Sequence, residues 1–131
     1  MAKSPHVDIM RSPLGRARGL GTARQGAAHW WGQRITAVAL VPLTLWFLCA
    51  MVRMTGASRQ DVVSWMAGPL PLVLMIALVI ATFHHLQLGL QVVIEDYVEN
   101  HALRVGAVLL VKGLALLLAL ACIVSALRLG L

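Results

Sequence analysis

Residues 69–94 read PLPLVLMIALVIATFHHLQLGLQVVI, a stretch without a single Asp, Glu, Lys or Arg. A helix needs about 20 apolar residues to cross the hydrocarbon core of a membrane. The stretch exceeds that length, so it predicts a transmembrane helix. Its unusual feature is the adjacent pair His84 and His85, because an ionisable side chain at this depth is costly and is usually functional.

Two further apolar runs, residues 35–54 and 103–127, are also long enough to cross a membrane. The whole chain of 131 residues is 60% hydrophobic and only 12% charged, with a mean hydropathy of +0.82. A soluble domain keeps about a quarter of its residues charged. Apolar runs of this length favour helices over barrel strands. We therefore expect an all-α membrane protein with three transmembrane helices, the first bent at Pro42, which form an incomplete bundle alone.

The basic residues predict the orientation. Residues 1–34 carry six Lys or Arg against the single Asp8 and have no helical or strand periodicity, so we expect a loosely ordered arm before a transmembrane unit over 35–131. The arm and the 95–104 loop share one side and hold seven Lys or Arg, while the other side holds three. The positive-inside rule then places the N-terminus in the cytoplasm and the C-terminus outside. A basic arm beside apolar spans is a topology signal, so no nucleic-acid partner is expected.

A helical wheel separates the two histidines. With steps of about 100°, one face holds His85, Gly89, Val92 and Asp96, and another holds His84, Leu88, Gln91 and Glu95. Imidazole is a common axial ligand of haem iron, and Gly89 leaves room one turn from His85 for a flat macrocycle. His84 looks more like a helix contact or a hydrogen-bonded side chain. His85 is therefore the better candidate ligand.

The same geometry predicts a partner chain. Two axial ligands approach iron from opposite sides, whereas neighbouring residues on one helix diverge by about 100°. The remaining histidines, His6, His29 and His101, lie outside the expected spans. If the haem has two histidine ligands, the second must then come from another polypeptide.

The run HHLQLGLQVVIEDYVEN, residues 84–100, resembles the signature of the hydrophobic membrane anchor, the D subunit, of succinate:quinone oxidoreductase (complex II). That family's pattern is a histidine, a glycine four residues later and an Asp-Tyr pair whose tyrosine follows the histidine by twelve; here these are His85, Gly89, Asp96 and Tyr97. The segment HWWGQRITAVALVPLTLW, residues 29–46, resembles the start of the same anchor. The resemblance extends over about residues 30–127.

The resemblance implies roles for individual residues. His85 becomes the axial ligand that this chain supplies to haem b, and Tyr97 a hydrogen-bond donor to ubiquinone at the cytoplasmic surface, with Asp96 beside it. Arg34 becomes a residue near the haem propionates or the quinone pocket. His29 resembles a family position near the propionates, but the sequence gives it no definite role.

The resemblance also implies a multi-subunit assembly in a bacterial inner membrane. A second three-helix cytochrome b subunit supplies the other haem ligand, so this chain is half of a heterodimeric haem-binding bundle. A flavoprotein subunit oxidises succinate, and an iron–sulfur subunit passes the electrons to quinone. This chain has no glycine-rich nucleotide loop and no cysteine cluster, so we expect it to anchor the soluble subunits and not to oxidise succinate itself.

Two alternatives remain open from the sequence. One is the anchor of a fumarate reductase, against which the Asp96–Tyr97 pair speaks. The other is a small transporter or assembly protein in which His84 and His85 relay protons. Lys112, about two and a half turns into the third span, is expected to extend toward the cytoplasmic interface; a propionate or anionic-lipid contact is its other interpretation.

Overall fold

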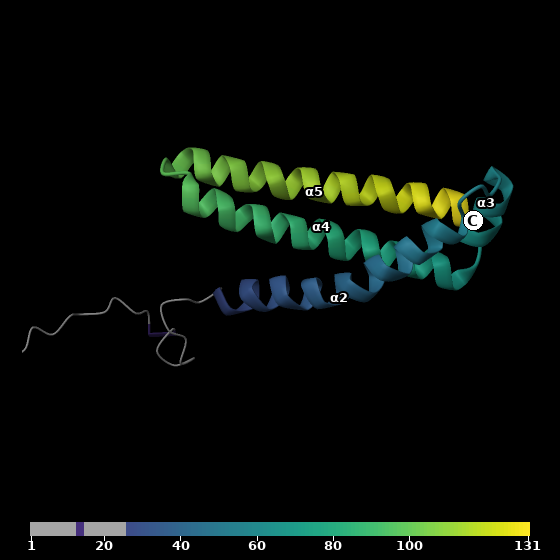
Figure 1. The fold of residues 1–131 in the computed structure, drawn as a ribbon. Helices are drawn as coiled ribbons and strands as arrows, with labels where there is room; N and C mark the ends of the chain where they lie inside the picture. The colour runs from purple at the N-terminus through teal and green to yellow at the C-terminus, as the bar shows by residue number, and fades with distance from the viewer. Residues whose placement is uncertain (1–12, 15–25) are drawn as a thin grey trace, which may run out of the picture.

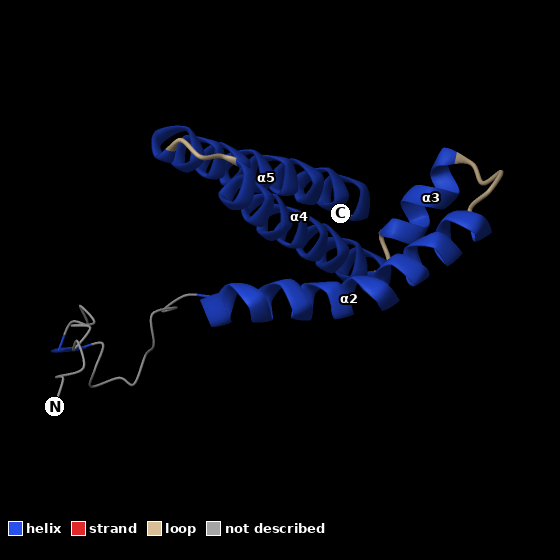
Figure 2. Cartoon of the chain, turned by 60° about the vertical axis from the view of Figure 1, so that its left-hand side comes forward, coloured by secondary structure: helices blue, strands red, loops and turns tan. Residues whose placement is uncertain are grey.

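The computed structural model describes residues 13–14 and 26–131, and all secondary-structure elements in these residues are helices. Its helices are α2 (Gly26–Arg53), α3 (Arg59–Met66), α4 (Pro69–Tyr97) and α5 (His101–Gly130) (Figure 2). The three long helices are each long and apolar enough to cross a membrane. The expected all-α fold with three transmembrane helices is therefore confirmed.

The first helix begins earlier than the sequence suggested. We expected a span from residue 35 after an arm without regular structure, but α2 already starts at Gly26. The segment GAAHWWGQR contains no proline, and a turn of helix extends readily from a long helix that already exists. His29 accordingly lies in the first turn of α2, and His101 is the first residue of α5; that both lie outside the membrane-spanning parts stays a prediction. The rest of the expected arm, residues 1–12 and 15–25, lies outside the described residues.

The connection between α2 and α4 contains the short helix α3, which was not predicted from the sequence. Ser58 begins α3 with a capping box: its hydroxyl accepts from the Asp61 N–H, and the Asp61 carboxylate accepts from the Ser58 N–H. Gly56 reverses the chain just before it with a φ of 83°, a conformation that favours glycine. Trp65 of α3 stacks on Trp46 of α2, with ring centroids 5.8 Å apart.

The three long helices form an open layer with α4 in the middle. Helix α4 packs against both α2 and α5, whereas no Cα atom of α2 comes within 8 Å of one in α5. Figure 1 shows that α2, which contains Pro42, changes direction along its length and crosses α4 obliquely. The start of α2 and the α4–α5 turn lie at one end of the layer, and α3 and the C-terminus lie at the other (Figure 1).

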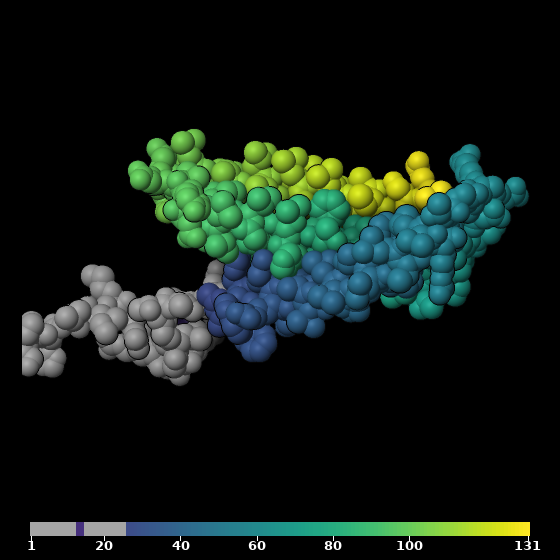
Figure 3. All heavy atoms as spheres, in the orientation of Figure 1, coloured from purple at the N-terminus to yellow at the C-terminus, as the bar shows by residue number. Residues whose placement is uncertain are grey.

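Little of the layer is buried within the chain. The buried apolar side chains among the described residues are Ala50, Met66, Ala81, Leu88 and Ala126. Small residues such as these alanines let transmembrane helices approach closely. Apolar side chains of all three long helices remain exposed, and the space-filling view shows α2 lying across the front of the layer without enclosing it (Figure 3). A surface this apolar is suited to lipid or to another membrane chain, and the protein is a multi-pass membrane protein.

Candidate cofactor site between α2 and α4

His85 lies on the side of α4 that faces α2. Its imidazole is half-buried, and both ring nitrogens have neighbours on α2. Nδ1 lies 2.9 Å from the Thr36 hydroxyl oxygen, and Nε2 lies 3.4 Å from the Gln33 side-chain nitrogen. Two polar residues from the preceding span therefore hold the ring in one orientation.

A hollow of about 390 Å³ opens beside this imidazole and is called the inner hollow here. Its walls are Trp30, Gln33, Arg34, Ala37 and Val38 of α2 and His85 of α4. The Arg34 guanidinium carbon lies 4.5 Å from the centre of the Trp30 ring, a cation–π contact that holds the positive charge at the rim. The inner hollow thus combines an imidazole, a guanidinium and an indole face.

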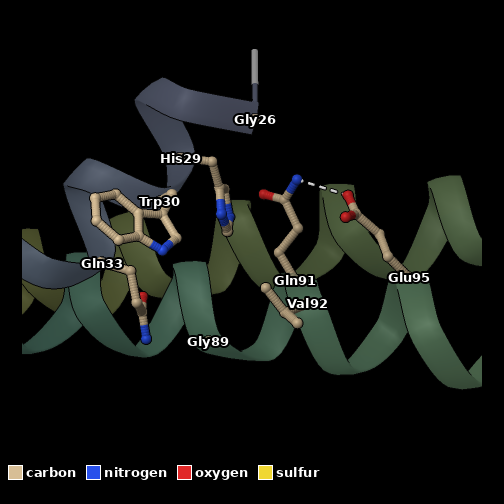
Figure 4. A pocket seen from close by; sticks show the side chains of 8 residues that line it. All are labelled: Gly26, His29, Trp30, Gln33, Gly89, Gln91, Val92 and Glu95. Atoms are coloured by element: carbon tan, nitrogen blue, oxygen red, sulfur yellow. Dashed lines mark hydrogen bonds between the residues drawn. The ribbon is translucent and has the colours of Figure 1, made fainter. Parts of the chain in front are cut away.

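A second, larger hollow of about 710 Å³, the outer hollow, continues toward the start of α2. It is lined by Gly26, His29, Trp30, Gln33, Gly89, Gln91, Val92 and Glu95. Figure 4 shows His29 and Gln33 extending from α2 toward α4, and Gln91 donating to the Glu95 carboxylate over 2.7 Å. The two hollows share Trp30 and Gln33, and His85 and Gly89, which line one hollow each, lie one turn apart on the same face of α4.

Gly89 has no side chain and so leaves space on this part of the α4 surface. A Cβ atom built at Gly89 would lie 3.5 Å from the Gln33 side-chain nitrogen, an ordinary contact distance, so a larger side chain would fill the space next to Gln33. Two polar atoms here are buried and have no hydrogen-bond partner among the described residues: His29 Nε2 and Gln33 Oε1. Buried polar groups are normally paired, so both atoms are suited to a polar group that enters the hollow.

His84 has a different environment from its neighbour. The imidazole is exposed and forms no hydrogen bond with another described residue, so of the two expectations for it, a helix contact or a hydrogen bond, the second is not met among those residues. It lines a smaller hollow of about 220 Å³ between α4 and α5, which also includes Gln87 and the exposed Lys112. The two histidines therefore have different polar neighbours, although His84 Nε2 also lies near α2, 3.9 Å from the position of a Cβ atom built at Gly32.

Tyr97 and Asp96 lie away from these hollows. Tyr97 is the last residue of α4, and 82% of it is exposed. Asp96 is also exposed, and neither residue lines the inner or the outer hollow. Of the residues singled out from the sequence, the structure thus brings together His85, Arg34 and Gly89, and places the Asp96–Tyr97 pair at the end of the same helix.

Gln33 and Thr36 contact His85 but were not recognised from the sequence. Both are polar residues in the first half of α2, three positions apart and so on one face of the helix. That pattern could have marked them as facing a neighbour. Which neighbour they face depends on the register of α2 against α4, which the sequence does not reveal.

The surface can offer a nitrogen ligand and a cation to the same bound group. Imidazole ligates transition metals through whichever ring nitrogen lacks a hydrogen, and a guanidinium binds carboxylates through two hydrogen bonds. Among residues 13–14 and 26–131, no three His, Cys, Asp or Glu side chains cluster as ligands of a bare metal ion. The arrangement is better suited to a group that brings most of its own ligands.

Comparison with known proteins adds to this geometry. Residues 8–127 match the family described as succinate dehydrogenase/fumarate reductase transmembrane subunit. The succinate dehydrogenase hydrophobic membrane anchor subunit of Rickettsia bellii is 34% identical over 115 residues, which cover 88% of this chain and 92% of that protein. The subunit of the same name from Paracoccus denitrificans is 32% identical over 89 residues, 68% of this chain and 69% of that protein.

A third relative is similar over a comparable part of the chain. The succinate dehydrogenase membrane anchor subunit of Reclinomonas americana is 28% identical over 97 residues, covering 71% of this chain and 80% of that protein. No solved structure matches the chain.

Proposed function

Because the chain belongs to the succinate dehydrogenase/fumarate reductase transmembrane subunit family, we propose that it is the hydrophobic membrane anchor of a succinate:ubiquinone oxidoreductase in a bacterial inner membrane. The names of its relatives support this role. The observation that carries the proposal is that His85 of α4 and Arg34 of α2 line one hollow. These residues lie 51 positions apart in the sequence (85 minus 34) and meet only through the packing of α2 on α4.

The residues around this hollow fit haem b. His85 can supply an axial nitrogen, and Arg34 can pair with a propionate. Gly89 leaves the neighbouring surface of α4 free of a side chain, and the buried, unpartnered His29 Nε2 and Gln33 Oε1 provide polar atoms for the same group. When bound, haem b supplies a one-electron redox centre whose potential depends on its ligands and their hydrogen bonds.

The other half of the haem site belongs to a second three-helix subunit in this proposal. His85 can approach iron from one side only, and the adjacent His84 lies on a different face. The open layer supports the presence of such a partner, because α2 and α5 are both packed on α4 but leave much of their apolar surface uncovered. The partner's helices complete the bundle and supply the opposite ligand.

The end of the layer with Tyr97 is proposed to face the soluble subunits. Tyr97 and Asp96 are exposed at the end of α4, where the phenol can donate a hydrogen bond to a ubiquinone carbonyl. An iron–sulfur subunit docks at this end, and a flavoprotein subunit joined to it oxidises succinate. This chain anchors both to the membrane and contributes side chains to the haem and quinone sites.

A pair of substitutions tests the haem role. His85→Leu should remove or strongly weaken the b-type absorption in a reduced-minus-oxidised spectrum of the purified complex, because the axial nitrogen is lost. His84→Leu is the matched control: its imidazole is exposed and does not line the hollow that holds His85 and Arg34, so its loss should leave the spectrum intact. Co-purification of the other subunits with both variants shows that assembly has been preserved.

Two results would reject this proposal. Loss of haem in His84→Leu but not in His85→Leu would assign the ligand to the other histidine. A wild-type preparation that is fully functional without haem absorption and without partner subunits would reject the anchor role. Such a result would favour a proton-relaying membrane protein.

A further inference from the structure

The Thr36 hydroxyl identifies which nitrogen of His85 carries the hydrogen. Its oxygen lies 2.7 Å from the Gly32 carbonyl oxygen, 3.1 Å from the Gln33 carbonyl oxygen and 2.9 Å from His85 Nδ1. Carbonyl oxygens only accept, and a hydroxyl group has one hydrogen to donate. That hydrogen is directed to the close Gly32 carbonyl within α2, which leaves an oxygen lone pair facing the imidazole. His85 Nδ1 must therefore be the donor in the third contact.

Gln33 leads to the same conclusion from the other side of the ring. Its side-chain nitrogen, which is only a donor, lies 3.4 Å from His85 Nε2. A hydrogen bond of this length is weak, but its direction requires a lone pair on Nε2. Two side chains on α2 thus favour one neutral tautomer, with the hydrogen on Nδ1 and a lone pair on Nε2 that is engaged only by the weak contact with Gln33.

We propose that Thr36 is a positioning residue that fixes His85 in this tautomer and presents Nε2 for ligation. The inference rests on the proposed haem role of His85 and deepens it. Histidines that ligate a metal commonly donate their second ring N–H to a nearby acceptor, which sets the tautomer and makes the ligating nitrogen more basic. Thr36 can accept because its own hydrogen is engaged by the backbone of α2. The preceding span thereby controls a ligand carried by α4.

If Thr36 had only a structural role in α2, its substitution would have a different effect. Threonine often donates to a carbonyl one turn back in its own helix, and removing such a bond would change only the stability of α2. The proposed role requires in addition that the imidazole itself changes when the hydroxyl oxygen is removed. The experiments therefore observe the imidazole and the iron, and do not rely on turnover.

The first experiment uses the full chain without haem, labelled with ¹⁵N-histidine in lipid nanodiscs. Imidazole nitrogen shifts and couplings report the tautomer, and the signals that vanish in His85→Leu identify this residue. We expect wild-type His85 to carry its hydrogen on Nδ1. A wild-type imidazole of His85 with its hydrogen on Nε2 would overturn the proposal, whether or not any Thr36 variant folds.

The second experiment compares Thr36→Val with Thr36→Ser in the assembled complex. Valine keeps the branched shape without the oxygen, and serine keeps the oxygen. We expect Thr36→Val to weaken haem retention by about tenfold, the lower end for losing such a partner. It should also raise the haem midpoint potential, because a less basic imidazole stabilises ferric iron less, and a tenfold change in relative affinity corresponds to about 59 mV. Thr36→Ser should match the wild type.

The outcomes separate this inference from the proposed function. A wild-type complex with a b-type spectrum, whose potential and low-spin ferric resonance are unchanged in Thr36→Val, overturns the role of Thr36 alone. That role is also overturned if Thr36→Ser shifts the potential as far as Thr36→Val. A wild-type complex without a b-type spectrum instead rejects the proposed haem site. If Thr36→Val does not assemble, the tautomer of the wild-type chain decides.

Discussion

Tyr97 is exposed, as its proposed hydrogen bond to ubiquinone requires. Its phenol ends α4 and is 82% exposed, so a molecule at the membrane surface can reach it. Tyr97→Phe removes only the hydroxyl group. We expect ubiquinone reduction to fall about tenfold, the effect of losing one hydrogen bond of about 1.4 kcal/mol. Steady-state assays of succinate-driven quinone reduction with the purified complex measure the change.

Succinate-dependent reduction of an artificial dye provides the control, because the dye takes electrons from the soluble subunits and should be unaffected. Unchanged quinone turnover in Tyr97→Phe would exclude the hydroxyl from the quinone site. An equal loss in both assays would instead indicate that the purified complex contains less of the soluble subunits, and so that the variant weakens their docking.

At the same scale, the sequence could separate His84 from His85 but could not find their contacts. Successive residues on a helix diverge by about 100°, so the helical wheel alone assigned the two imidazoles to different faces. The structure places the His85 ring nitrogens against Thr36 and Gln33 of α2, whereas His84 lines a hollow that also includes Lys112. The role of His85 as a ligand stays a prediction. Gln33 and Thr36 escaped notice because a contact across 49 or 52 positions depends on helix packing and not on local pattern.

Among the elements, α3 begins with a small hydrogen-bond network that includes a titratable carboxyl group. The hydroxyl and the backbone N–H of Ser58 both hydrogen-bond to the Asp61 carboxylate and lower its pKa. A lowered pKa stabilises the folded state above the ordinary pKa of the carboxyl group, and this stabilisation is lost as the pH falls through the lowered value. We expect α3 to lose helicity over that acidic range, measured by ¹³Cα chemical shifts of its residues.

Asp61→Ala should make α3 less helical at neutral pH and abolish the acid-dependent change. Gln60→Ala is the matched control, since Gln60 is an exposed neighbour outside the capping box. An acid-dependent change that persists in Asp61→Ala would assign the titration to another group.

The contact between the end of α5 and the α3–α4 corner depends on the absence of a side chain at Gly130. A Cβ atom there would lie 2.9 Å from the Met66 carbonyl oxygen and 3.0 Å from both methyl groups of Leu72. Backbone cannot yield as a flexible side chain can, so we expect Gly130→Ala to destabilise the protein by about 1–3 kcal/mol. Thermal unfolding in detergent measures the effect.

Gly113→Ala is the control for this substitution, because nothing lies within 4 Å of a Cβ atom at Gly113. It should be neutral or stabilising by up to about 1 kcal/mol, since alanine favours a helix over glycine. Equal unfolding midpoints for the two variants would show that the end of α5 moves away without cost.

For the whole molecule, the sequence was sufficient for the number of spans but not for their arrangement. Three long apolar runs predicted three transmembrane helices, and the structure contains them in α2, α4 and α5. Hydropathy gives no information on which helix lies between the others, because all three are apolar around most of their circumference. The early start of α2 at Gly26 was also missed, since the residues before 35 are polar enough to resemble an arm. That extension brings His29 to the outer hollow.

The layer has two chemically different ends, and this asymmetry predicts its orientation in the membrane. Arg34 and Arg104 lie toward the end that continues into the basic N-terminal sequence, while Arg53, Arg59 and Arg128 lie toward the other end. Cytoplasmic segments carry the excess of Lys and Arg, so the N-terminus and the α4–α5 turn should be cytoplasmic. Alkaline phosphatase, which is active only outside the cytoplasm, should therefore be active when fused after Gly56 or Leu131 and inactive when fused after Asn100. The opposite pattern would place Tyr97 on the outer surface and would separate it from the soluble subunits that it is proposed to serve.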